Sequence, residues 1–276
     1  MHTRDHGIFA PYLERWTLVP DGAELSTRAA RLLPVKRGDE PAMLKVATDP
    51  DERHGAILLR WWAGDGAARL HEADGPALLL ERAMGTRSLN EAARAGHDDE
   101  ATIILCDAIA ALHTPRTAPI PAGLVDLPTW FAELEPAARR HGGLLREAHA
   151  TAQRLLSEPR DVRPLHGDVH HDNVLDFAAR GWLAIDPKHL VGERGFDYAN
   201  IFCNPDMDGG PPVAIDERRF HRRLELVTSR AGLGRERLLD WILAWAGLSA
   251  AWILGDGDAP TVDLRIAELA LAARSP

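Results

Sequence analysis

The chain has 276 residues and a formal net charge of −9, with 45% hydrophobic and 26% charged residues, as in an ordinary globular protein with a sizeable core. The negative charge argues against nucleic acid as a partner, because phosphates recruit basic surfaces, and it favours a cationic small molecule. The two cysteines, Cys106 and Cys203, are too few for a disulfide framework or a zinc site, which indicates a reducing compartment.

The N-terminal third of the chain predicts a short helix followed by β-strands. The first residues, MHTRDHGIFAPY, carry charges and a proline where a signal peptide needs an apolar run, so we expect a cytoplasmic protein. A helix is expected over residues 5–14, and strands are expected over residues 16–20, 31–36, 42–48 and 78–83. This part of the chain is therefore rich in β-structure.

Lys45 lies inside one of these strands, between apolar neighbours. A buried ammonium group needs a partner, because an unpaired charge in a core is costly. We expect that partner to be Glu52, at the start of a helix that opens with Asp49-Pro50-Asp51-Glu52. Two simpler interpretations stay open: Lys45 can face solvent on an alternating strand, and Glu52 can serve only as the third residue of a capping box.

Beyond Gly85 the pattern becomes helical, with apolar residues at helical spacing. Pro136 is expected to kink or split one of the helices. The most apolar stretch, Trp241–Leu254, is fourteen residues long and too short to span a bilayer, so we expect a buried helix and no membrane partner. The predicted helices cover residues 98–113, 130–140, 144–156, 216–231 and 235–254.

The most informative stretch runs from His166 to Asp186 and reads HGDVHHDNVLDFAARGWLAID. Two short strand-like runs, residues 174–177 and 182–185, flank a turn that carries Gly181 near its end. A glycine in a short connection between two such runs is typical of a tight antiparallel hairpin.

A turn centred between Ala179 and Arg180 places Asn173 directly opposite Asp186, about 4.5–5.5 Å away across the ladder. These two side chains would offer oxygen ligands to Mg²⁺, which takes one or two from protein and leaves its other positions to phosphate and water. Asp168, just upstream, is left to accept a proton from a hydroxyl. This division of labour is typical of phosphoryl transfer by kinases.

Two other interpretations of the same residues stay open. Asp and Asn are common in turns because their side chains cap backbone groups. His166, His170 and His171 could instead suggest a hydrolytic metal site, although neither cysteine is near them.

The segment HGDVHHDN resembles the catalytic loop of aminoglycoside phosphotransferases, which replace the HRDxxxxN of protein kinases by HGDxxxxN. Ile185-Asp186-Pro187 stands where protein kinases have DFG, and Gly181–Asp206 resembles the streptomycin 6-phosphotransferase and hydroxyurea kinase branch of that family. The resemblance implies an α+β, bilobal protein-kinase-like fold. Residues 1–84 would form a β-rich nucleotide-binding lobe, and residues 85–276 a mainly helical catalytic and acceptor-binding lobe.

The resemblance also implies the roles of the individual residues. The γ-phosphoryl group of ATP would pass to a hydroxyl, with Asp168 as the base, Asn173 and Asp186 on Mg²⁺, and Lys45 on the nucleotide phosphates. The remaining implied residues serve the nucleotide or support the catalytic loop. They are Ser26 and Thr27 for phosphate, the Glu81 carbonyl and Ala83 amide for adenine, and His166 and Asp197 for the loop. Ser26 and Thr27 can equally form an ordinary polar turn, and Asp197 can be a plain helix N-cap.

By the same resemblance the acceptor is streptomycin, the enzyme would confer antibiotic resistance, and we expect a monomer. Carboxylates bind the guanidinium groups of streptomycin through paired hydrogen bonds. The candidates are Glu193, Asp206, Asp256 and Asp258. Hydroxyurea or another small molecule is an alternative acceptor, and a nucleotide-binding pseudokinase is an alternative class. A protein kinase is disfavoured because no activation loop with an APE-like end follows Asp186.

Overall fold

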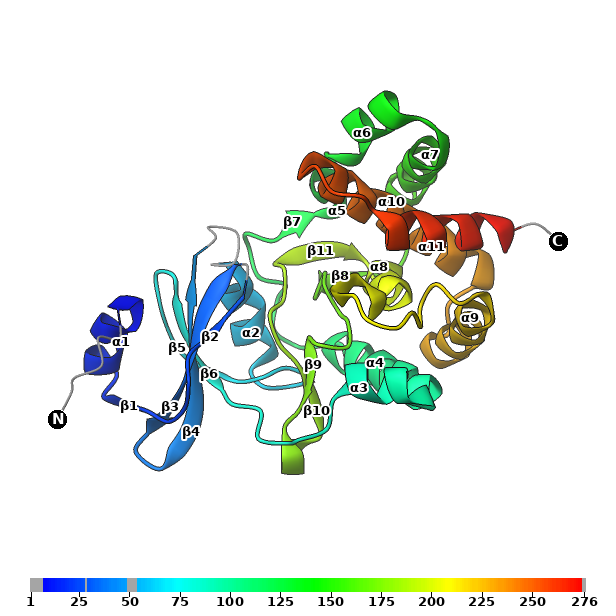
Figure 1. Ribbon diagram of the computed structural model, residues 1–276. Helices are drawn as coiled ribbons and strands as arrows, with labels where there is room; N and C mark the ends of the chain where they lie inside the picture. Colours follow the sequence, from blue (N-terminus) through cyan, green and yellow to red (C-terminus); the bar gives the residue numbers. More distant parts are fainter. Residues whose placement is uncertain (1–6, 28, 49–53, 275–276) are drawn as a thin grey trace.

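The computed structural model describes residues 7–27, 29–48 and 54–274, and it consists of a β-sheet lobe followed by a mainly helical lobe (Figure 1). The predicted α+β, bilobal architecture is confirmed. The sheet ends at Glu81 and the first helix of the second lobe begins at Leu89. We propose that the boundary between the lobes, predicted at residue 84, lies in this extended connection.

The first lobe is a six-stranded antiparallel sheet in the order β1-β3-β4-β6-β5, with β2 on β3. Alternating residues of the central strands face opposite sides. Val35, Leu44 and Leu79 pack against Phe9 at the start of α1, whereas Leu78 faces α2 and the second lobe. The elements are β1 Leu18–Pro20, β2 Leu25–Ser26, β3 Ala30–Arg37, β4 Glu40–Ala47, β5 Leu70–Asp74, β6 Ala77–Glu81, η1 Gly7–Phe9, α1 Ala10–Arg15 and α2 Ala56–Trp62.

The second lobe is built around α10, Arg235–Gly255, which is surrounded by α7, α8 and α11. By length and composition α10 could cross a membrane, but 72% of the apolar window is buried inside the protein, as in a core helix. The other helices are α3 Leu89–Ala92, η3 Ala93–His97, α4 Asp98–Leu112, α5 Leu127–Trp130, α6 Leu134–His141, α7 Gly143–Ser157, α8 Gly195–Ala199, η5 Asn200–Cys203, η6 Asp206–Asp208, α9 Glu217–Ala231 and α11 Thr261–Ala272.

Several short elements were not predicted. Strands β7 (Val125–Asp126), β8 (Val162–Leu165) and β11 (Leu190–Glu193) form a second sheet, and each is too short for a clear period of two. Helix α11 was also not predicted, because the last predicted helix ends at residue 254. Pro136 was expected to split a helix, but it lies in the first turn of α6, where its missing N–H costs little.

Helix α11 contains a carboxyl group, that of Asp263, which is 1% exposed. Burial raises the pKa of this carboxyl to about 6, although Ser249 and Cys203 partly offset the shift. The folded protein therefore binds this proton more tightly than the unfolded chain does, whose carboxyl titrates near 3.8. The resulting stability is present below the unfolded pKa and is lost as pH rises through the folded pKa, about 3 kcal/mol in all.

We predict that Asp263→Asn stabilises the protein relative to wild type more at pH 7.5 than at pH 4.5, because the amide carries no charge to bury. The measurement is the free energy of unfolding by denaturant at the two pH values. Glu268→Gln, at an exposed position on the same helix, is the control. Its free energy of unfolding relative to wild type should be the same at both pH values. An Asp263→Asn difference that does not change with pH would contradict the assignment.

Candidate active site

The segment between β8 and β9 (Val174–Asp176) carries the predicted catalytic loop. The Asp197 carboxylate accepts hydrogen bonds from the backbone of this loop. Asp197 Oδ2 accepts from the His166 N–H at 2.9 Å, and Oδ1 accepts from the Gly167 N–H at 2.7 Å. His113 Nε2 lies 2.8 Å from Oδ2. Helix α8 begins at Gly195, so Asp197 lies in its first turn and is not its N-cap. Its carboxylate therefore fixes the backbone of the loop.

His166 fixes the other side of the same loop. Its ring is fully buried, with Nε2 2.7 Å from the Ile185 carbonyl and Nδ1 accepting from the Asp168 N–H at 3.2 Å. These partners require the proton on Nε2. Burial lowers the pKa of His166 in spite of the nearby Asp197 and Asp168 carboxylates, which keeps the ring neutral.

The hairpin after the loop has a register one residue away from the predicted one. Leu175 pairs with Leu183, and Val174 pairs with Ala184 of β10 (Trp182–Ala184). The turn is a single 3₁₀ turn centred on Ala179, closed by a bond from the Phe177 N–H to the Gly181 carbonyl at 2.8 Å. The predicted turn was centred half a residue later, and this difference shifts the pairing.

Because of this register, Asn173 lies opposite Ile185, whose N–H donates to the Asn173 carbonyl at 2.9 Å. Asp186 follows one residue later in a left-handed conformation, with φ 57°. Asp tolerates this region better than most residues. The prediction that Asn173 and Asp186 face each other across the ladder was therefore wrong, and Asp186 enters the site through a bend in the backbone.

Asp186 meets Lys45 across the two lobes: Lys45 Nζ lies 2.9 Å from Asp186 Oδ1. The Lys45 side chain is 4% exposed on β4, and Asp186 gives its buried ammonium group a partner of opposite charge. Glu52, the predicted partner, lies outside the described residues. The site thus takes one charge from each lobe.

Asp168 and Asn173 lie beside this pair. Asn173 Nδ2 donates to the Asp168 carbonyl at 2.9 Å and lies 3.4 Å from Asp168 Oδ2, so its own Oδ1 is the atom that can face a cation. One carboxylate, from Asp186, and one amide oxygen fit the hard, oxygen-seeking Mg²⁺. Among the described residues, no three His, Cys, Asp or Glu side chains are grouped as a metal site.

The predicted nucleotide contacts on the first lobe occupy defined positions. The Thr27 hydroxyl donates to the Ala30 carbonyl and accepts from the Ala30 N–H, both at 3.1 Å, so it closes the β2–β3 turn. Ser26 is exposed in β2, opposite Arg31. Thr27 therefore has the turn role that the sequence left open.

Glu81, at the end of β6, connects the lobes with its side chain. Its carboxylate forms an ion pair with Arg180 in the hairpin turn and accepts from the Arg69 N–H at 3.1 Å. Ala83 lies beside a small apolar cluster formed by both lobes. The members of that cluster are Ala68, Phe177 and Leu183, with Leu175, Ala83 and Ile185 packed against them.

The four acids predicted to bind the acceptor divide into two pairs. Glu193 is 3% exposed and accepts from Trp241 Nε1 at 2.7 Å and from Arg237. Asp206 is 8% exposed and accepts from the N–H groups of Val213 and Ile215. Both carboxylates are therefore held by hydrogen bonds inside the protein.

The second pair, Asp256 and Asp258, is exposed at the end of α10. The sequence therefore predicted one role for four acids, of which two are buried in internal contacts and two are exposed.

Two polar residues next to Asp168 were missed. Lys188 Nζ lies 3.8 Å from Asp168 Oδ2, and Asn200 Nδ2 donates to Asp168 Oδ1 at 3.0 Å. Lys188 follows Asp186 by two residues, so the charge pattern could have indicated it. Asn200 follows Asp197 by three residues, which places both on the same face of a helix, toward the loop.

We predict that Asp197→Ala destabilises the protein by about 3 kcal/mol or more and abolishes catalysis. The substitution leaves two buried backbone donors without an acceptor, and each costs about 1–3 kcal/mol. Denaturant unfolding and turnover measure the two effects. Asp197→Asn, which keeps one oxygen, should lose less. Asp99→Ala removes an exposed carboxylate and should stay within about 1 kcal/mol of wild type. An Asp197→Ala variant as stable as wild type would refute this role.

Comparison with known proteins places the chain among kinases that modify antibiotics. It is 54% identical over 246 residues to streptomycin 3''-kinase of Klebsiella pneumoniae, covering 89% of this chain and 92% of that protein. It is 35% identical to streptomycin 6-kinase of Streptomyces griseus, covering 91% and 83%. It is 33% identical to hydroxyurea phosphotransferase of Kitasatospora aureofaciens, covering 96% and 78%.

Solved structures share the fold at low identity. A thermostable mutant of aminoglycoside phosphotransferase APH(4)-Ia, in ternary complex with ADP and hygromycin B, aligns with a TM-score of 0.67 at 15% identity, over 98% of this chain and 99% of that one. A choline/ethanolamine kinase family protein from Mesorhizobium loti also gives 0.67, at 16% identity and 96% and 92% coverage. The profile of the aminoglycoside/hydroxyurea antibiotic resistance kinases matches residues 15–257, and the chain belongs to this family.

Proposed function

We propose that this kinase transfers the γ-phosphoryl group of ATP to a hydroxyl of streptomycin and thereby inactivates the antibiotic in the cytoplasm. The observation that carries the proposal is the meeting of Lys45 and Asp186 from two lobes beside Asp168 and Asn173. A cation, a metal-binding carboxylate, an amide oxygen and a separate carboxylate are the parts that phosphoryl transfer needs.

Asp168 would orient the acceptor hydroxyl and take its proton as the oxygen attacks phosphorus. Its Oδ2 is the oxygen for this step, because Oδ1 accepts from Asn200. Asn173 and Asp186 would hold Mg²⁺, which supplies positive charge to the phosphates when bound. Lys45 would exchange its ion pair with Asp186 for phosphate oxygens.

The adenine would lie against the apolar cluster around Ala68, with the Glu81 carbonyl and the Ala83 amide as its backbone partners. Ser26 would cover the phosphates from the β2–β3 turn that Thr27 closes, and Glu52 would face Lys45 from the start of the helix. These contacts extend the proposal.

For the acceptor we propose the 3'' hydroxyl of streptomycin. The support is the 54% identity to the 3''-kinase, compared with 35% to the 6-kinase. The 6 hydroxyl, which the resemblance of Gly181–Asp206 implied, is the second candidate because two 6-kinases match over most of the chain. Asp256 and Asp258 are the proposed partners of the guanidinium groups, since both side chains are exposed whereas Glu193 and Asp206 are buried.

The direct test is the product. Incubation with ATP, Mg²⁺ and streptomycin should give a singly phosphorylated antibiotic, and phosphorus–proton correlation by NMR should locate the phosphate on the 3'' hydroxyl. Phosphate on the 6 hydroxyl would favour the second candidate. Phosphorylation of hydroxyurea alone would reject the acceptor, and nucleotide binding without turnover on any acceptor would indicate a pseudokinase.

Asp168→Asn should reduce phosphoryl transfer by about 10²- to 10⁴-fold, because the amide cannot take the hydroxyl proton. The affinity for ATP, measured by calorimetry, should stay close to that of wild type. Turnover within a few-fold of wild type would exclude Asp168 as the base.

Asp186→Ala should make ATP affinity nearly independent of Mg²⁺, because the site loses its metal-binding carboxylate. Titrations of ATP with and without Mg²⁺ measure this. Asp172→Ala, an exposed carboxylate on the same loop that accepts from Asn90, is the matched control and should keep the Mg²⁺ dependence. The same Mg²⁺ dependence in Asp186→Ala as in wild type would show that another group binds the metal.

A further inference from the structure

A row of buried amide groups leads from Asp168 into the helical lobe. Asn200 Nδ2 donates to Asp168 Oδ1 at 3.0 Å. Asn204 Nδ2 in turn donates to the side-chain Oδ1 of Asn200 at 2.9 Å and to its backbone carbonyl at 3.1 Å. Asn200 is 2% exposed and Asn204 is 4% exposed, so water is largely excluded from both.

The directions of these hydrogen bonds can be assigned from one group whose role is fixed. The backbone carbonyl of Asn200 can only accept, so the group of Asn204 that faces it must be the NH₂. That NH₂ also faces Asn200 Oδ1, which leaves the NH₂ of Asn200 to point at Asp168. Asn200 therefore presents a donor, and the Asp168 carboxylate presents an acceptor.

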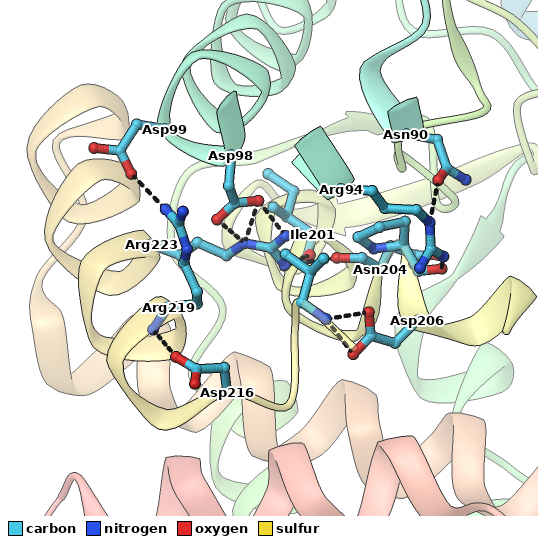
Figure 2. A network of polar contacts seen from close by, with 12 residues as sticks. Asn90, Arg94, Asp98, Asp99, Ile201, Asn204, Asp206, Asp216, Arg219 and Arg223 are labelled. Atoms are coloured by element: carbon cyan, nitrogen blue, oxygen red, sulfur yellow. Dashed lines mark hydrogen bonds and ion pairs between the residues drawn. The ribbon is translucent and has the colours of Figure 1, made fainter. Parts of the chain in front are cut away.

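Arg223 of α9 anchors the far end of this row. Figure 2 shows its guanidinium between Asp98 and the segment of Ile201 and Asn204. Nη1 donates to the Ile201 carbonyl at 2.9 Å and to the Asn204 carbonyl at 2.6 Å, while Nε donates to Asp98 Oδ2 at 3.0 Å. Arg223 and Asp98 are both 0% exposed, and a fully buried guanidinium fork with satisfied donors holds its partners in one geometry.

We propose that Asn200 is a positioning residue for phosphoryl transfer, which holds Oδ1 of Asp168 so that Oδ2 faces the acceptor hydroxyl, and that Asn204 and Arg223 act through it. This inference rests on the proposed role of Asp168 as the base. Oδ2 is the less tightly held oxygen, with Asn173 Nδ2 at 3.4 Å and Lys188 Nζ at 3.8 Å. A charge-assisted hydrogen bond to Oδ1 restrains rotation of the carboxylate without using the oxygen that reacts.

The first test is kinetic. Asn200→Ala should lower kcat for streptomycin about 10²-fold, the loss that a misplacement of about 1 Å can cause. The KM values for ATP and streptomycin should stay within about twofold. Asn200→Asp has nearly the same shape, but its carboxylate cannot donate, so it should lose at least as much kcat. Recovery of activity in Asn200→Asp would show that only the shape matters and would overturn the proposal.

The second test is a double-mutant cycle. Asn204→Ala should lower kcat in the wild-type background and have little further effect in Asn200→Ala, because residues of one network are not additive. Arg222→Ala is the matched control, since Arg222 neighbours Arg223 and pairs with Asp99 at the surface. Its kcat should equal that of wild type. Thermal unfolding confirms that each variant is folded at the assay temperature.

Full additivity, or a kcat of Asn200→Ala within twofold of wild type, overturns the inference while the proposed function stands. A wild-type enzyme that phosphorylates no acceptor overturns the proposed function and this inference together. The wild-type assay thus distinguishes the two failures.

Discussion

One electrostatic constraint joins the two lobes: the ammonium group of Lys45 is buried on β4, and a charge buried there needs a partner of opposite sign. Asp186 provides it from the other lobe at 2.9 Å. An unpaired buried charge costs several kcal/mol, so this contact favours the arrangement in which the two lobes face each other. Glu81 and Arg180 form another ion pair across the lobes at the opposite end of the hairpin. Two ion pairs thus connect the lobes on either side of the hairpin.

The carboxylate of Asp168, the proposed base, is held in place through the residues around it. Asp197 holds the backbone of its loop, a neutral His166 connects that loop to the residue before Asp186, and Asn200 holds one of its oxygens. Each support is buried and hydrogen-bonded, and a carboxylate held in this way loses little freedom when the acceptor binds. Under the proposed function, the net charge of −9 would attract a cationic antibiotic, and these few residues would carry out the chemistry.

Much of this arrangement could be predicted from the sequence, because the catalytic loop and hairpin are local. Spacing alone grouped Asp168, Asn173 and Asp186, and an apolar strand indicated Lys45. The hairpin register was wrong by one residue, because the turn type depends on a positive φ at Ala178 that no sequence signal marks. Contacts between segments far apart in the sequence could not be predicted from it. The Asp98–Arg223 pair joins residues 125 apart, and Glu193 is held by Arg237 and Trp241 of α10, which lie 44 and 48 residues further along the chain.

The most direct measurement of the central claim is a crystal structure of the enzyme with a non-hydrolysable ATP analogue, Mg²⁺ and streptomycin. The account predicts that Lys45 leaves Asp186 for phosphate oxygens, that Asn173 and Asp186 bind the metal, and that Oδ2 of Asp168 lies about 3 Å from the acceptor hydroxyl. A complex in which Lys45 stays on Asp186, or in which the hydroxyl lies against another residue, would contradict it.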